Sequence, residues 1–470
     1  MQNSSTVTQS VQHSPASFAP DNGLLSSLGR FACEFELEQA PEVVRRQARL
    51  TLLDTVGCMV AGVETPESQA FVSAERELSA RPQASVVGQR EKMDMAAATR
   101  SNAYFGDVFE LNDLTGGHAG IAVVPATLAY AEAKGRSGHE LATAIIVGIE
   151  SVSRLYAAYY PTMKPYTSTG ITPPGIPSTL GTTAGLARLA GFNVAQATRA
   201  LQIAAALAGW CPAEVIFGQG GSIKPMMFGA WPGSVALQAI AYANAGFDGP
   251  SQVLESPIGL YATLAHSYDP KAITEPSVWH LAQPRRKRHA CCGYIHSAID
   301  AVIELRRQGV RLEDAAHIKI YMPAYIIPGV SKTQAPCTAN EARFHAQYCI
   351  ALAINGARLI LPHHSSELAR HLPAVQHLLD RIHVVQNEEL THYHQCVVHG
   401  LRADGSEAFS QRLSAPKGAP LDPLSDDEVR GKFRQLCAES MDSGALDAYI
   451  EDIDALESAS KCDWIIGRFA

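Results

Sequence analysis

The chain has 470 residues, 46% of them hydrophobic and 18% charged, which is enough for two or three domains with a large core. A formal net charge of -8 argues against a nucleic-acid-binding surface and leaves no polybasic patch for a membrane. The longest apolar run, residues 203–210, is about half the length of a membrane span. The ten cysteines include no C-x-x-C pair, so we expect no zinc cluster, no disulfide framework and a cytoplasmic location.

Helical patterns begin after a polar N-terminal segment. Residues 1–22 are rich in serine and glutamine and lack the cationic start and apolar core of a signal peptide, so we expect them to be disordered. Apolar residues three and four apart predict an amphipathic helix over residues 41–63. Ser137 and Glu140 form a capping box that begins another helix. Similar patterns predict helices over residues 96–111, 126–134, 138–157, 179–190, 194–211 and 233–245.

The densest group of ionisable residues lies within residues 101–125. Asp107, Glu110, Asp113 and His118 fall within twelve residues, and three glycines surround the histidine. Glycines let the backbone approach whatever the imidazole faces, and histidine titrates near neutrality, so this pattern suits proton transfer. A helix–turn–helix corner with solvated acids explains the same residues equally well.

Two irregular segments interrupt the helices. Residues 156–177 are rich in proline and tyrosine, and a loop of this length in a compact helical domain is more often functional than idle. Residues 218–232 place Lys224 among glycines and apolar residues. One hypothesis is a partly desolvated ammonium that binds a carboxylate or an oxyanion. The alternative is a surface lysine in a flexible loop.

The composition changes near residue 284. Residues 285–288 read Arg-Arg-Lys-Arg, a run that usually indicates a solvated charged cluster. The adjacent Cys291 and Cys292 are expected in the core or in the wall of a pocket, because neighbouring side chains rarely ligate one ion together. His296 lies near the start of a helix, whose positive partial charge favours the neutral imidazole.

Strand patterns follow this basic segment. Residues 317–325 alternate in polarity, and residues 390–413 predict a hairpin with its turn at Asp404 and Gly405. With a helix expected over residues 340–355, this part of the chain predicts a smaller α+β domain. From residue 423 a capped helix is expected, and the chain ends in helices.

One pair of histidines resembles a metal site. His392 and His394 would share one face of the predicted strand, as a two-histidine site needs. Polar alternation on an exposed strand is the simpler explanation. The sequence contains no Gly-rich phosphate loop, no Gly-x-Ser-x-Gly and no His-Glu-x-x-His.

Several stretches, in order over residues 25–465, resemble the MmgE/PrpD family of dehydratases, decarboxylases and epimerases. They are LTLLDTVGCMVAG, SNAYFGDVFELNDLTGGHAG, STLGTTAGLARLAGFN, IKPMMFGAWPGSVALQAIAYANAGFDGP, KRHACCGYIHSAIDA and PKGAPLDPLSDDEVRGKF. The resemblance implies a mainly α fold, in which a large all-helical domain carries an inserted α+β lid. It divides the chain into a disordered segment 1–22, helical residues 23–281, a lid of residues 282–416 and returning helices 417–470.

The resemblance also implies an active site between the two domains. His118 is similar to the family's catalytic histidine, Glu110 stands where the family usually has aspartate, and Asn112 and Asp113 follow it. Lys224 resembles the substrate lysine of the family. The family implies a homodimer with no cofactor and no metal.

Other positions of the family site depart from its usual residues or match it loosely. Lys287 opens the Cys-Cys motif, Cys292 falls where the decarboxylases carry a histidine, and His296 closes the motif. Thr172 replaces a family histidine, and Tyr325 is similar to a tyrosine of the lid. These departures put the named lyase activities in question and leave the substrate open.

The resemblance implies a lyase for a small polycarboxylate, which dehydrates an acid such as 2-methylcitrate or decarboxylates an acid such as cis-aconitate. In our hypothesis, Lys224 and Lys287 bind substrate carboxylates, while His118, oriented by Glu110 or Asp113, moves a proton. The alternative is an epimerase of an iminodisuccinate-like acid, whose second face would be served by Tyr166, Tyr325 or Lys287. A ligand-binding protein without catalysis is a third reading.

Overall fold

The computed structural model describes residues 23–217 and 221–470. Segment 1–22, expected to be disordered, and residues 218–220 of the lysine-bearing loop lie outside the described residues. In the described part of the chain, helices predominate, and the strands form a two-stranded and a four-stranded sheet. The predicted fold class, mainly α with a smaller α+β domain, is therefore confirmed.

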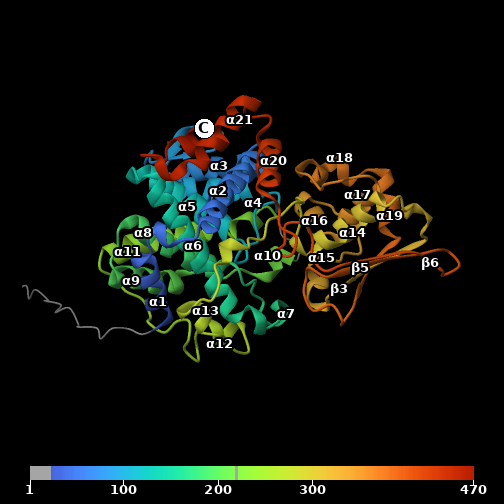
Figure 1. Ribbon diagram of the computed structural model, residues 1–470, viewed down its shortest axis with the longest axis horizontal. Helices are drawn as coiled ribbons and strands as arrows, with labels where there is room; N and C mark the ends of the chain where they lie inside the picture. The colour runs from blue at the N-terminus through green and yellow to red at the C-terminus, as the bar shows by residue number, and fades with distance from the viewer. Residues whose placement is uncertain (1–22, 218–220) are drawn as a thin grey trace, which may run out of the picture.

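A large helical body lies on the left of Figure 1, and its apolar core contains residues from Leu24 to Leu281 together with residues from Leu424 to Phe469. Its central contacts are made by small residues: a Cβ on Gly181 or Gly185 would collide with the backbone of the neighbouring helix. The long helices are α1 (Leu24–Glu34), α2 (Glu42–Gly62), α3 (Pro66–Leu78), α4 (Met95–Asp107), α5 (Ala119–Lys134), α6 (Gly138–Tyr159), α8 (Gly175–Ala190), α9 (Val194–Leu207) and α11 (Ala230–Asn244). The helix α8 packs against α6, α11, α5 and α9.

Short elements complete this body. The strands β1 (Ala84–Val86) and β2 (Gln89–Met93) form a hairpin that the sequence did not predict, because its strands are too short for a clear alternation. Gly88, at its turn, has a φ of 71°, in the left-handed region that glycine favours. The short helices are α7 (Tyr166–Thr169), α10 (Ala213–Phe217), α12 (Leu260–Leu264) and α13 (Lys271–Thr274).

The lid lies on the right of Figure 1, and its apolar core continues into the helical body through Ala103, Ile121, Cys211, Ile216, Phe228 and Ala230. Its sheet has the order β4-β3-β5-β6, in which β3 pairs with β4 in parallel and with β5 antiparallel. The elements are α14 (His296–Arg307), β3 (His317–Met322), α15 (Ile327–Val330), α16 (Ala339–Arg343), α17 (Ala346–Ile354), α18 (Glu367–Arg370), α19 (Pro373–Leu379), β4 (Ile382–Gln386), β5 (Cys396–Leu401) and β6 (Glu407–Leu413).

Several predicted boundaries are wrong for identifiable reasons. The helix expected from residue 126 begins at Ala119, because α5 continues through Pro125. The helix predicted over 340–355 is two helices, since the side chain of His345 caps the start of α17. The hairpin begins at Cys396, so His392 precedes β5 instead of lying on it.

One helical segment meets the length and apolarity of a membrane span, contrary to the sequence-based expectation. It covers Gly138–Thr162, and 89% of its apolar window is buried inside the protein. Burial on that scale is typical of the core helix of a globular domain. The capping box predicted at its start is present between Ser137 and Glu140.

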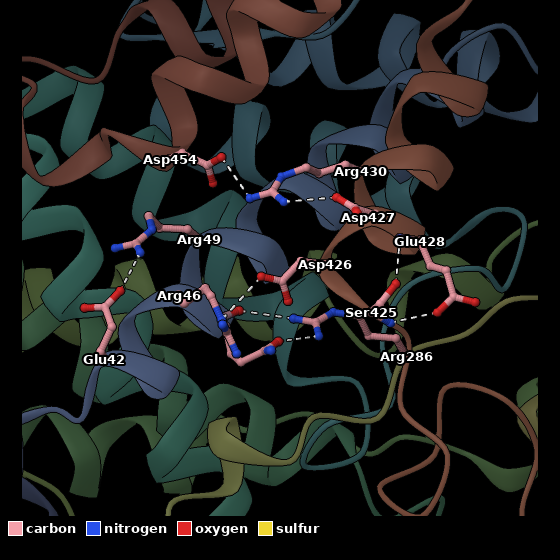
Figure 2. A network of polar contacts seen from close by, with 11 residues as sticks. Glu42, Arg46, Arg49, Arg286, Ser425, Asp426, Asp427, Glu428, Arg430 and Asp454 are labelled. Carbon is pink, nitrogen blue, oxygen red and sulfur yellow. Dashed lines mark hydrogen bonds and ion pairs between the residues drawn. The ribbon is translucent and has the colours of Figure 1, made fainter.

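The last helices return to the helical body. They are α20 (Asp426–Cys437), α21 (Ser443–Asp454) and α22 (Trp464–Gly467), and α20 packs along α2. Figure 2 shows the polar contacts beside this packing: Arg46 of α2 lies 3.4 Å from Asp426, and Arg430 lies 2.9 Å from Asp454. The C-terminal helices therefore pack on the helical body, while the predicted domain boundaries stay a prediction.

Candidate active site

A cavity of about 80 Å³ is lined by residues of both the helical body and the lid. Its walls come from the segment before α5, from the proline- and tyrosine-rich segment 156–174, from α10 and from the basic motif before α14. The lining residues are Glu110, Leu114, Gly117, His118, Tyr156, Tyr160, Met163, Tyr166, Thr172, Pro173, Pro174, Ile216, Phe217, Phe228, Arg285, Cys292, Gly293, Tyr294, Phe344 and Tyr393.

His118 stands at the residue before α5 with a φ of 81°, which is uncommon for a side chain other than glycine. Two glycines, Gly116 and Gly117, precede it with φ values of 57° and 74°. The imidazole stacks on Phe228, with 4.6 Å between ring centres. This backbone conformation ends the loop sharply and leaves the ring at the cavity wall.

A chain of hydrogen bonds fixes the tautomer of His118. The amide nitrogen of Asn112 donates to Asp107, so the amide oxygen of Asn112 faces His118. That oxygen lies 2.7 Å from Nδ1, which must therefore carry the proton. The other nitrogen, Nε2, has no hydrogen-bond partner in the described part of the chain. Burial, assisted by the charge of Lys287, lowers the pKa of His118 well below its usual value near 6.5, so the ring is a neutral base.

Two buried lysines form a compact ionic cluster beside this ring. Lys224 Nζ donates to Asp107 Oδ2 at 3.0 Å and pairs with Glu110 Oε1, while Lys287 Nζ donates to Glu110 Oε2 at 2.6 Å. Burial lowers the pKa of Lys224 to about 8, against the opposing effect of Asp107, and also lowers the pKa of Lys287. Two carboxylates thus balance two ammonium groups.

These contacts decide between the alternatives that the sequence left open. Lys224 is buried, so the reading of a surface lysine in a flexible loop is wrong. The run 285–288 is not a solvated cluster, because Arg286 and Lys287 are both buried. Glu110, with a φ of 54°, turns back toward both lysines instead of facing solvent.

Asp113 lies apart from the imidazole. Its Oδ1 accepts a hydrogen bond from the Gly120 backbone at 3.1 Å, at the start of α5. Burial and the nearby Asp54 raise the pKa of Asp113 to about 6, and Arg286 opposes this rise. The expectation that Glu110 or Asp113 orients His118 is corrected here, because the contact is made by Asn112.

Arg285 is a cavity residue that the sequence-based reasoning missed. Its guanidinium donates to the hydroxyl of Tyr393 at 3.3 Å, and its backbone N–H donates to Thr115. It forms no ion pair with an acid among the described residues. Arg285 lies two residues before Lys287, which opens the family's Cys-Cys motif, and this position could have indicated that Arg285 is a site residue.

Three other predicted site residues line the cavity. The hydroxyls of Tyr166 and Thr172 are buried and have no hydrogen-bond partner within the described residues. Burial raises the pKa of the Cys292 thiol, so this side chain is neutral. Both hydroxyls are therefore available to a ligand.

Besides Asp113, Lys224 and Lys287, two further predicted residues do not line the cavity, His296 and Tyr325. His296 Nε2 lies 3.2 Å from the Cys291 carbonyl oxygen, and its ring packs edge-on against His289. Tyr325 accepts a hydrogen bond from the backbone N–H of Tyr393 at 2.9 Å, so it holds a lining residue from outside. The structure thus gives both side chains protein partners and keeps them out of the cavity wall.

Metal ligation finds no support in residues 23–217 and 221–470, where no three His, Cys, Asp or Glu side chains are placed to hold an ion. His392, one of the suggested pair, uses Nδ1 to accept the backbone N–H of His394. The two rings lie edge to face at 4.5 Å, which is a packing contact.

Comparison with known proteins covers almost the whole chain. The profile of the MmgE/PrpD N-terminal domain matches residues 26–273, and that of the MmgE/PrpD C-terminal domain matches residues 289–455. The cis-aconitate decarboxylase-like protein oryM of Aspergillus oryzae is 24% identical, over 94% of this chain and 96% of the relative. The cis-aconitate decarboxylase of Aspergillus terreus is 23% identical over 92% of each chain, and that of Homo sapiens is 26% identical over 89% of each.

Proposed function

Because the chain belongs to the MmgE/PrpD family, we propose that it is a lyase for a small carboxylic acid, with His118 as the catalytic base. The observation that carries this proposal is the state of the imidazole, whose Nδ1 is held by Asn112 while Nε2 has no partner among the described residues. A neutral ring with a free nitrogen is ready to accept a proton. The polycarboxylate expected from the resemblance is one acid of this class.

Dehydration uses this base directly. Nε2 of His118 takes a proton from the carbon next to the substrate carboxylate, and the electron pair left behind forms the new double bond. The hydroxyl of the neighbouring carbon leaves as water, taking the proton back from the His118 imidazolium. Negative charge that develops on the carboxylate is stabilised by nearby cations, and Arg285 lines the same cavity.

Decarboxylation is the second candidate, and it is favoured by the names of the relatives, which are cis-aconitate decarboxylases or similar to them. The bond to the carboxyl carbon breaks, carbon dioxide leaves, and the electron pair stays on the substrate carbon, which then takes a proton. His118 would have to be protonated beforehand in order to donate it. The lowered pKa of this residue opposes that state, which weighs against His118 as the proton donor of a decarboxylation.

Epimerisation is supported by one further observation. Tyr166 lines the cavity with a buried hydroxyl that has no hydrogen-bond partner among the described residues. Together with His118, this hydroxyl would give proton donors and acceptors on two sides of a substrate carbon. The alternative function is therefore an isomerase that exchanges one proton without losing a group.

Proton NMR in deuterated water tests these reactions together. The purified protein is given 2-methylcitrate, citrate, cis-aconitate, iminodisuccinate and 3-hydroxyhexanoate in turn, beside the His118→Ala variant. A new vinyl signal from the wild type, slowed on the order of 100-fold or more by the variant, is expected. Deuterium at the α-carbon of an otherwise unchanged acid would instead indicate the epimerase. Full turnover by His118→Ala would contradict the role of the histidine.

We also propose that the chain is a homodimer. Four aromatic side chains on and around α9 and α11 are exposed on this chain: Trp210, Trp231, Tyr242 and Phe247. Exposed aromatic groups of this kind are enriched at protein interfaces. Light scattering at micromolar concentration is expected to give the dimer mass, and a monomer would contradict the proposal. The cytoplasmic location and the independence from cofactors stay predictions.

A further inference from the structure

The cavity wall carries few charges for a site expected to bind several carboxylates. Among its lining residues, Glu110 and Arg285 carry formal charges, while the buried His118 is neutral. The lining also includes a set of large apolar side chains: Leu114, Met163, Ile216, Phe217, Phe228 and Phe344. A wall of this kind suits an apolar substituent better than a second or third carboxylate.

The two lysines that the sequence assigned to substrate carboxylates already have carboxylate partners. Glu110 reaches both ammonium groups, and Asp107 holds Lys224 from the other side. Neither lysine lines the cavity, because Glu110 stands at the wall in front of them. A substrate carboxylate would have to displace Glu110, which would leave a buried acid without its partners.

Arg285 differs from these lysines. It lines the cavity, its guanidinium has the Tyr393 hydroxyl as a partner, and no acid pairs with it in the described part of the chain. The neighbouring tyrosine raises the pKa of Arg285, so this side chain keeps its charge. An arginine without an acid in a half-buried site is matched by a carboxylate, which can take two of its N–H groups.

We infer that the substrate is a monocarboxylic acid with an apolar substituent, whose single carboxylate binds Arg285 and whose substituent packs against Met163, Phe217 and Phe344. This inference rests on the proposed function and narrows its substrate class. Glu110 acts as a built-in carboxylate that occupies Lys224 and Lys287 in place of the substrate. The negative partner that a polycarboxylate would bring is thus already part of the protein.

Three unreactive acids with six carbons each separate the effect of charge from that of size. Hexanoate has one carboxylate, adipate two and tricarballylate three. Titration calorimetry with the wild-type protein, at one ionic strength, is expected to give the tightest binding for hexanoate, by at least about tenfold over tricarballylate. Tighter binding of tricarballylate would overturn the inference and would indicate that Glu110 yields its lysines to the ligand.

Substitution of the arginine locates the carboxylate. Arg285→Gln is expected to weaken hexanoate binding by at least about tenfold, and Arg285→Lys by less, because the charge is kept. Arg288→Gln is the matched control, since Arg288 pairs with Asp300 in the same basic run and does not line the cavity. If the three proteins fold alike, equal affinity of hexanoate for Arg285→Gln, Arg288→Gln and the wild type would overturn the inference.

The experiments distinguish a failure of the inferred substrate class from a failure of the proposed mechanism, because binding and turnover are measured separately. His118→Ala removes the proposed base and is expected to leave the affinity for hexanoate within about twofold of the wild type, because the carboxylate is held elsewhere. If the order of the three acids holds but His118→Ala keeps full turnover, the lyase mechanism is wrong and the substrate class stands. If His118→Ala abolishes turnover but tricarballylate binds best, the substrate class is wrong and the mechanism stands.

Discussion

Asn112 Oδ1 lies 2.7 Å from His118 Nδ1, and the amide that carries this oxygen donates its own N–H to Asp107. A carboxylate at the end of α4 therefore decides which nitrogen of the imidazole bears the proton. The acid does not touch the histidine, so its effect passes through the orientation of one amide group. Asn112 is a positioning residue in this arrangement.

Replacement of Asn112 by alanine is expected to lower kcat by about 10- to 100-fold with little change in KM, because the base loses its fixed tautomer but the cavity keeps its walls. Steady-state kinetics on the substrate found by NMR measure both constants. Asp113→Asn is the matched control, since Asp113 caps α5 and does not contact His118. Equal losses in the two variants would mean that the effect comes from the loop as a whole.

The pH dependence of activity is expected to show a limb on the alkaline side. Lys224 has its pKa lowered to about 8, so its charge is present below that pH and is lost as the pH rises through it. The charge of Lys224 balances Asp107 and Glu110, and kcat/KM is expected to fall in the same range. Because burial keeps His118 neutral, the acid limb is expected below the usual histidine pKa.

The variant Lys224→Arg tests whether the loss of activity at alkaline pH comes from the deprotonation of Lys224. Arginine keeps its charge at all accessible pH values, so the variant is expected to be slower overall but to lack the alkaline limb. Profiles of kcat/KM over a broad pH range measure this. An alkaline limb that persists unchanged in Lys224→Arg would assign it to another group.

Lys432 ties the C-terminal helix α20 to the site from behind. Its Nζ lies 2.7 Å from Asp54 and donates to the backbone oxygens of Leu111 and Lys287. Lys432→Met leaves a buried acid unpaired, so a loss of about 3 kcal/mol or more in the free energy of unfolding is expected. Scanning calorimetry compares this variant with the wild type.

A second basic residue of the same helix provides the control. Arg434 pairs with Asp447 at 2.7 Å, but both side chains are about half exposed. Arg434→Met is expected to cost less than about 1 kcal/mol, because water screens an exposed ion pair. If the two variants unfold at the same temperature, the buried network around Lys432 does not stabilise the packing of α20.

Asp113 links stability to pH in a direction unusual for an acid. Its pKa in the folded protein is raised to about 6, so the folded state binds a proton that the unfolded chain has released above its ordinary value near 3.8. Stability from this group is thus highest at low pH and is lost as the pH rises toward 6, by up to about 3 kcal/mol.

Asp113→Asn cannot release that proton, and its amide oxygen can still accept the Gly120 N–H. The difference in unfolding free energy between the variant and the wild type is therefore expected to grow in favour of the variant from about pH 4 to about pH 7. Thermal unfolding at several pH values measures this difference. A constant difference across that range would mean that Asp113 titrates normally.

The sequence by itself determined the elements with strong local signals. The capping box at Ser137 begins a helix where it was expected, and the capped helix expected from residue 423 begins at Asp426, because a cap depends on residues only three apart. The motif around His118 also marked the region of the cavity, since its glycines and acids are close in the chain.

Only the tertiary structure decided which charges meet. Lys224 and Lys287 are far from Glu110 in sequence, so no local pattern could show that one glutamate pairs with both. Likewise, no local pattern could show that Arg285 lines the cavity while the neighbouring Arg286 is buried against Gln47 and Thr51. Local signals fix helices because their partners are neighbours, whereas a site is assembled by long-range packing that brings distant side chains into one dry volume.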